Sequence, residues 1–105
     1  MANTTRHYGI DMRTIIKCLY RRNLKMSPEK LSSQIGHVCF NLGKYNPVPE
    51  KIIVLKASNF KFQEQKDRLL HGDMYQHPYY IQVDQGLTEV EPGTETVLGW
   101  VELID

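Results

Sequence analysis

Five basic side chains near the start of the chain are spaced so that they could bind phosphate groups together. Arg13, Lys17 and Arg21 occur at steps of four residues, and Arg22 and Lys25 follow closely. On a helix, residues four apart lie on the same face, so these five would form a basic ridge. Lys and Arg contacts to phosphate give an affinity that falls with salt and carries no sequence information. The spacing predicts a nucleic-acid-binding face, with a solvated helix surface as the alternative.

Acidic side chains gather in the second half of the chain and indicate a different kind of partner. Residues 1–61 contain eleven Lys or Arg and three Asp or Glu, whereas residues 62–105 contain two and nine. Three of these carboxylates flank a predicted hairpin turn: Glu89, Glu91 and Glu95. Such a surface could dock on a basic protein by charge complementarity, although charges also protect strand edges. The alternative function is therefore a protein–protein interaction module or inhibitor.

Phe40 would belong to the same protein-binding surface if it is exposed. It falls on the polar side of the helix that we expect around it, where an aromatic side chain needs cover or a partner. Cover by the C-terminal half of the chain is the favoured interpretation, because exposed apolar patches are uncommon on monomers.

A third group of side chains could hold a metal ion. His71, Asp73 and His77 offer two imidazoles and a carboxylate within seven residues, as in an open zinc site. Their spacing matches no known metal motif, so a metal-dependent enzyme is the weaker alternative. The chain has neither a glycine-rich phosphate loop nor a nucleophile elbow, and Cys18 and Cys39 look like packing residues. We therefore expect a non-catalytic regulatory protein without a cofactor.

Length and composition indicate one small globular domain. The chain has 105 residues, of which 41% are hydrophobic and 24% charged. No apolar run approaches the roughly 18 residues of a membrane span, and the first residues lack the apolar segment of a signal peptide. We expect a cytoplasmic protein with reduced thiols, no membrane contact and a flexible segment at residues 1–8.

Two helices are predicted in the N-terminal half. Residues 10–23 have apolar side chains at helical spacing, namely Met12, Ile15, Ile16 and Leu19. A second helix should begin after Ser27, which can cap it, with Pro28 in the first turn. Its apolar stripe runs to residue 42. If the chain turned at Gly36, the segment would form a helix-turn-helix-like unit, and a continuous helix is the alternative.

The remaining pattern alternates between strand and helix. Residues 51–56 are rich in β-branched side chains and predict a buried strand. Residues 59–70 favour a helix capped by Ser58, with a strand over 59–62 as the alternative. Strands are predicted over 79–83, 87–91 and 94–104, the last with apolar side chains on both faces. The expected fold is α+β, with two N-terminal helices, a middle strand or helix segment and a C-terminal antiparallel sheet.

Overall fold

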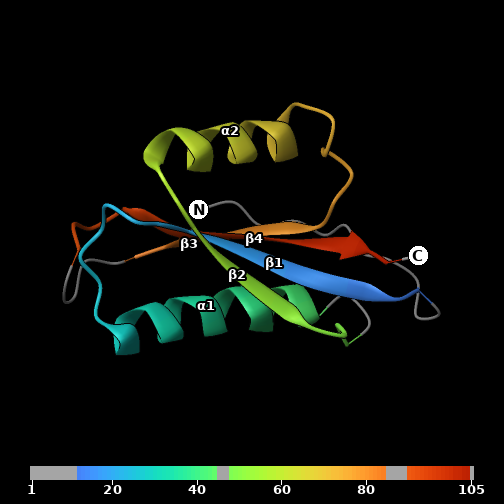
Figure 1. Cartoon of the computed structure of the whole chain (residues 1–105), viewed down its shortest axis with the longest axis horizontal. Coiled ribbons are helices and arrows are strands. Elements are labelled where there is room, and N and C mark those ends of the chain that lie inside the picture. Colours follow the sequence, from blue (N-terminus) through green and yellow to red (C-terminus); the bar gives the residue numbers. More distant parts are fainter. Residues whose placement is uncertain (1–11, 45–47, 85–89, 105) are drawn as a thin grey trace.

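A central sheet separates two helices, one on each of its faces (Figure 1). The computed structural model describes residues 12–44, 48–84 and 90–104. Along this part of the chain the elements are β1 (Thr14–Arg21), α1 (Pro28–Gly43), β2 (Ile52–Ala57), α2 (Asn59–Leu70), β3 (Tyr79–Val83) and β4 (Glu95–Leu103). The chain is a single compact α+β domain in which helix and sheet form three layers.

The sheet is mixed, with the strand order β2-β1-β4-β3. β1 pairs in parallel with β2, and β4 runs antiparallel to both β1 and β3. The predicted order of two helices followed by an antiparallel sheet is therefore wrong, because a strand comes first and the helices alternate with strands. A parallel pair needs a crossover connection, and α1 provides it between β1 and β2.

The first predicted helix, residues 10–23, is wrong, because Thr14–Arg21 form the strand β1. Ile16 and Cys18 point toward α1, while Leu19 points toward α2. Because both faces of the strand are covered, apolar residues occur on both sides, and their spacing imitates a helical stripe. The β-branched run Thr14-Ile15-Ile16 suits a strand better than a helix.

Each face of the sheet has its own hydrophobic core. Val38 and Leu42 of α1 pack on Val97 and Val101 of β4. On the other face the α2 residues Phe62 and Leu69 contact a cluster that also contains Leu19, Ala57, Met74, Tyr79, Ile81, Leu98 and Trp100. The prediction that β4 buries side chains on both faces is confirmed.

Both predicted helix starts downstream of β1 are confirmed. The Ser27 hydroxyl accepts a hydrogen bond from Lys30 N–H at 3.1 Å, and Ser58 accepts one from Lys61 N–H at 3.2 Å. α1 continues without interruption through Gly36, so the helix-turn-helix interpretation is wrong. None of the helices in the described ranges is long and apolar enough to cross a membrane.

The predicted strand at residues 51–56 exists as β2, but it is not buried. β2 forms an edge of the sheet, and Ile52, Val54 and Leu55 are 43–48% exposed. The strands predicted at 79–83 and 94–104 are confirmed as β3 and β4. Most of the predicted strand 87–91, like residues 1–8, lies outside the described residues.

Candidate functional site

The basic ridge is spread along a strand and the loop after it instead of lying on a helix. Arg13 precedes β1, while Lys17 and Arg21 belong to it. A step of four residues also keeps side chains on one face of a strand, but it separates them by about 13 Å instead of one helical turn. Arg22 and Lys25 follow β1 in the connection to α1 and are exposed. The five side chains therefore do not form the compact ridge that the sequence predicts.

Two of the five residues contact the protein's own carboxylates. Arg13 forms a two-pronged ion pair with Glu50, and Lys17 lies 3.1 Å from Glu102. Partial burial alone would raise the pKa of Glu102, but hydrogen bonds from Trp100 and Lys17 hold the pKa below its ordinary value. Glu102 therefore stays ionised and partly neutralises Lys17.

Arg21 joins three elements of the fold and is not available as a binding side chain. Its guanidinium donates to the Asn59 side chain at 2.8 Å and to the backbone carbonyl of Glu95 at 3.2 Å. It also lies over the Phe62 ring, 5.6 Å from the centroid. Arg21 thus ties β1 to α2 and β4, a structural role.

A groove between α2 and the β2–β1 side of the sheet collects cations instead. It has a volume of about 640 Å³, and part of its floor is formed by Leu19 and Leu55. Among the described residues, a single carboxylate, Glu64, lines it. The basic residues along the groove are Lys17, Arg22, Lys56, Lys61 and Arg68. We call these five residues and their surroundings the basic groove.

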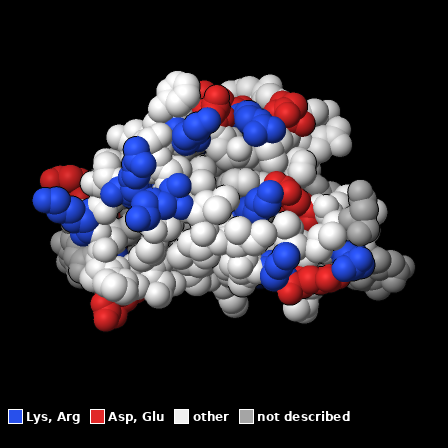
Figure 2. All heavy atoms as spheres, viewed as in Figure 1, with Lys and Arg blue, Asp and Glu red and all other residues white. Residues whose placement is uncertain are grey.

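Arg22 and Lys56 are the least neutralised cations of the basic groove. Both are exposed, and neither forms an ion pair with any carboxylate in the described part of the chain. By contrast, Lys61 lies 3.6 Å from Glu64, and Arg68 pairs with Asp73 at 2.9 Å. Figure 2 shows Lys and Arg side chains on both halves of this face, some of them beside Asp and Glu side chains. The groove therefore keeps a positive surface despite its rim carboxylates.

Sequence reasoning missed three cations of the basic groove, namely Lys56, Lys61 and Arg68. Lys56 lies near the end of β2 and Lys61 in the first turn of α2, with the cap Ser58 between them. The predicted cap at Ser58 already implied that a strand ends next to the start of a helix. Basic residues on both sides of this cap could therefore have been predicted to lie close together.

The predicted acidic surface is only partly available. Glu95 is bound by Lys66, whose Nζ lies 2.8 and 2.9 Å from the two carboxylate oxygens. Glu91 is exposed, and Glu89 lies outside the described residues.

Phe40 is not covered by the rest of the described chain, contrary to the favoured interpretation. It is 67% exposed on α1, and Lys44 lies over its ring at 4.9 Å.

The three potential metal ligands take up different contacts. Asp73 receives two hydrogen bonds from the Arg68 guanidinium, at 2.9 and 3.0 Å. The His77 ring hydrogen-bonds with the carbonyl of Val101 at 2.9 Å, and His71 ends α2. Within the described ranges, no three His, Cys, Asp or Glu side chains converge as a metal site would require. The residues give no geometric support to the metal-dependent alternative.

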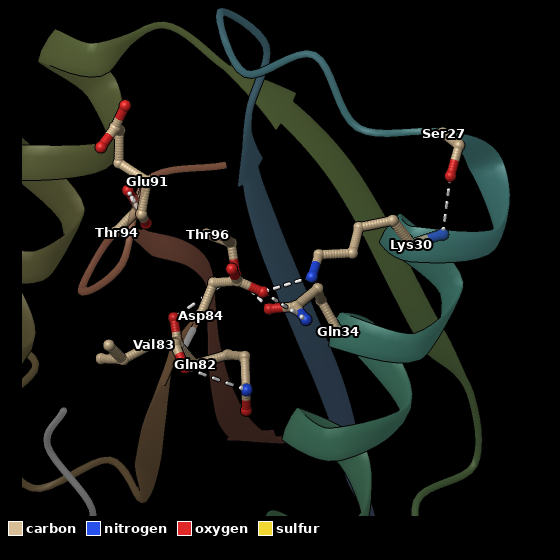
Figure 3. Close-up of polar contacts among 9 residues, drawn as sticks. All are labelled: Ser27, Lys30, Gln34, Gln82, Val83, Asp84, Glu91, Thr94 and Thr96. Carbon is tan, nitrogen blue, oxygen red and sulfur yellow. Dashed lines mark hydrogen bonds and ion pairs between the residues drawn. The ribbon is translucent and has the colours of Figure 1, made fainter. Parts of the chain in front are cut away.

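A buried polar cluster fastens α1 to the β3 and β4 strands. In Figure 3, Lys30 and Gln34 point from α1 toward Asp84 and Thr96. Lys30 forms an ion pair with Asp84, and the Thr96 hydroxyl donates to Gln34 at 2.6 Å. Gln34 donates to Asp84 at 3.4 Å. We call the cluster of Lys30, Gln34, Asp84 and Thr96 the latch. Because the Asp84 side chain is only 4% exposed, we infer that the latch stabilises the fold and does not bind a ligand.

The side chains of Cys18 and Cys39 are neighbours in the fold, a contact that the sequence did not predict. Their sulfur atoms lie 3.9 Å apart between β1 and α1. The hydrogen bond between them, together with burial, raises the pKa of Cys18, and the same hydrogen bond lowers the pKa of Cys39. Both side chains lie in the α1-side core, as expected for packing residues, but Cys39 is only partly buried.

Iodoacetamide should alkylate Cys39 of the folded protein well before Cys18. The thiolate is the reactive form, and Cys39 has both the lower pKa and the greater exposure. Quenching the reaction at intervals and mapping modified peptides by mass spectrometry measures the two rates. Both residues should react at similar rates in denaturant, and equal rates in the folded state would contradict the difference in exposure and pKa between the two thiols.

A scan against known protein families found no family model that matches this chain. The function must therefore be inferred from the geometry of the described surface.

Proposed function

We propose that this protein is a small non-catalytic regulatory protein that binds nucleic acid through the basic groove. The observation that supports the proposal is the concentration of five Lys or Arg residues around one groove, where the described part of the chain contributes a single lining carboxylate. A phosphate backbone offers a row of negative charges that such a groove can follow. The proposal keeps the cytoplasmic location expected from the sequence.

The contacts in the groove favour binding that does not depend on base sequence. Its available groups are ammonium and guanidinium ions, which contact phosphate and position a strand without reading bases. Trp100 lines the groove but is only 4% exposed, and its indole N–H is bonded to Glu102. Trp100 therefore supports the groove floor and does not serve as a stacking platform.

An Arg22→Glu/Lys61→Glu variant should bind nucleic acid on the order of tenfold more weakly near physiological salt. The two reversals remove two cations from the groove and add two anions, while both sites are exposed and outside β2. Fluorescence anisotropy with a labelled oligothymidylate, and with single-stranded RNA and a duplex of equal length, measures affinity. The slope of log affinity against log salt should fall by about two.

The matched control is Lys25→Glu/Lys44→Glu. It changes the net charge by the same amount at exposed positions that do not line the groove. This control should keep most of the affinity. Equal weakening by both variants would show that overall charge, and not the groove, holds the nucleic acid. Undiminished binding by the folded groove variant would refute the site.

A second candidate is protein binding through Phe40. The exposed ring lies beside a hollow of about 440 Å³ on α1, which Gly36, His37 and Lys44 help to line. This surface lies on the helix that covers the other face of the sheet from α2 (Figure 1). A Phe40→Ala variant should therefore leave nucleic-acid affinity unchanged, and a protein partner that depends on Phe40 would support the second candidate.

A further inference from the structure

We propose that two copies of this chain pair along β2, in antiparallel orientation, with Val54 of each copy at the two-fold axis. The pairing would join two four-stranded sheets into one continuous sheet. It would also set the two basic grooves side by side. This last consequence rests on the proposed function, whereas the pairing does not.

In the part of the chain that the structure describes, β2 has a free edge, and most of its side chains are apolar. It is bonded to β1 on one side and forms the end of the sheet on the other. Ile52, Val54 and Leu55 are 48%, 43% and 44% exposed. An apolar strand with a free edge is a template for pairing with another strand. Pairing would bury these side chains and satisfy the free backbone groups together.

The backbone hydrogen bonds identify which residues of β2 face outward. The carbonyl of Lys51 accepts from Ile16 N–H at 3.1 Å, and that of Ala57 accepts from Arg22 N–H at 2.8 Å. Residues 51, 53, 55 and 57 therefore direct their backbone groups toward β1. The backbone groups of Ile52, Val54 and Lys56 point away from the sheet.

This set of outward residues selects one register. Val54 is the middle of the three, so a two-fold axis at Val54 places Ile52 opposite Lys56 of the second copy. All three residues of both strands then pair, with about six hydrogen bonds across the junction. An axis at any other position leaves outward groups of β2 unpaired.

The apolar side chains of β2 also favour this register. On the α1 face of the sheet, Val54 lies opposite the second copy's Val54. On the α2 face, Ile53 lies opposite the second copy's Leu55. Side chains directly opposite each other across antiparallel strands make the main contacts of a sheet, and here they are apolar. The exposed surface of β2 is thus complementary to itself.

Charge is compatible with this register. With the axis at Val54, Lys51 faces the second copy's Ala57 and Lys56 faces the second copy's Ile52, so no two lysines lie directly opposite each other. Like charges directly opposite each other would destabilise a strand pair. Shifting the axis midway between Ile53 and Val54 would set residues that bond to β1 opposite residues that face outward, so their backbone groups could not pair.

Pairing of this kind keeps both α2 helices on the same face of the joined sheet. Leu55 and Lys56 line the basic groove and also belong to the pairing strand. The two grooves would therefore adjoin across the two-fold axis. A nucleic acid could cross from one groove to the other, so the dimer should bind a longer strand than a monomer.

Sedimentation equilibrium of the full chain without nucleic acid tests the pairing directly. We expect a concentration-dependent species of twice the 12.2 kDa chain mass. Val54→Lys should abolish it, because the new ammonium groups would face each other at the axis. The matched control, Leu103→Lys, changes a residue of similar exposure on β4 and should leave the dimer intact. A wild-type monomer, or a dimer in folded Val54→Lys, would overturn the proposal.

Cysteine cross-linking tests the register. In a Cys18→Ser/Cys39→Ser background, Val54→Cys should form a covalent dimer under mild oxidation, in which two thiols lose their hydrogens to the oxidant. Directly opposed residues are about 5.5 Å apart between Cα atoms, within the range of a disulfide. Ile52→Cys should not cross-link, since Ile52 faces the second copy's Lys56. Equal cross-linking of both variants would refute the register.

These measurements separate the dimer from the proposed function. The groove variant Arg22→Glu/Lys61→Glu leaves β2 unchanged, so it should dimerise normally while binding nucleic acid weakly. A normal dimer without nucleic-acid affinity would remove only the function. A monomer with strong affinity would remove only the dimer.

Discussion

Asp84→Ala is expected to lower the free energy of unfolding by about 3 kcal/mol, a large effect for a domain of this size. Asp84 is the carboxylate of the buried latch, and Lys30, whose side chain is only 15% exposed, depends on it for charge compensation. Removing the carboxylate leaves a largely buried ammonium ion without its partner, and also removes an acceptor from Gln34. Urea denaturation followed by circular dichroism measures the loss.

Asp73→Ala is the matched control for the latch. Asp73 also accepts hydrogen bonds from a basic residue, Arg68, but its side chain is 69% exposed. Water and salt replace most of what such a surface pair contributes, so stability should change far less. A Lys30→Met/Asp84→Leu double variant should recover much of the loss, because it leaves no unpaired charge. Similar losses in Asp84→Ala and Asp73→Ala would contradict the assigned burial.

The helices that could be predicted from the sequence are those whose signals are local. Ser27 and Ser58 each cap a helix through a residue three positions later, and Pro28 fits the first turn of α1. These interactions are complete within a few residues. Tertiary packing therefore does not override these local helix signals.

The spacing of apolar residues could not identify β1 as a strand, because the environment of β1 is set by distant residues. Its two faces are covered by α1 and α2, so Ile15 and Ile16 do not have to share a side as they would on a surface helix. The resulting pattern fits a helical period as well as a buried strand. The β-branched run Thr14-Ile15-Ile16 favours the strand, and the placement of β1 between β2 and β4 explains why both of its faces are apolar.

The basic groove likewise combines residues that are close together in the sequence with residues that only the fold brings near. Arg22 was identified from the sequence because it lies in a basic segment. Lys56 and Lys61 lie more than thirty residues later, and the groove exists only because β2 pairs with β1. The carboxylates Glu50 and Glu102 that neutralise part of the predicted ridge are also distant in the sequence. Charge composition indicated the half of the chain involved, but not the surface.

Gly99→Ala is expected to destabilise the fold by about 1–3 kcal/mol, although it adds a single methyl group. Gly99 lies within β4, between Cys18 of β1 and Tyr80 of β3. A Cβ atom there would lie 2.2 Å from Cγ1 of Val38 and 3.2 Å from Cδ1 of Leu42. The helix would have to move away from the sheet, and the core between them would loosen.

A second glycine separates this steric effect from the backbone effect of alanine. Nothing lies within 4 Å of a Cβ built on Gly36 in α1, so Gly36→Ala should raise the stability by about 0.5–1 kcal/mol.

Val38→Ala alone should cost stability through a cavity, yet it should cost less in the Gly99→Ala background, where it makes room for the new methyl group. The sign of this coupling, obtained from four urea denaturation curves, tests the closeness of α1 to β4. Simple additivity would mean that the helix does not touch the sheet at Gly99, and the α1-side core would then need a different packing from the one described.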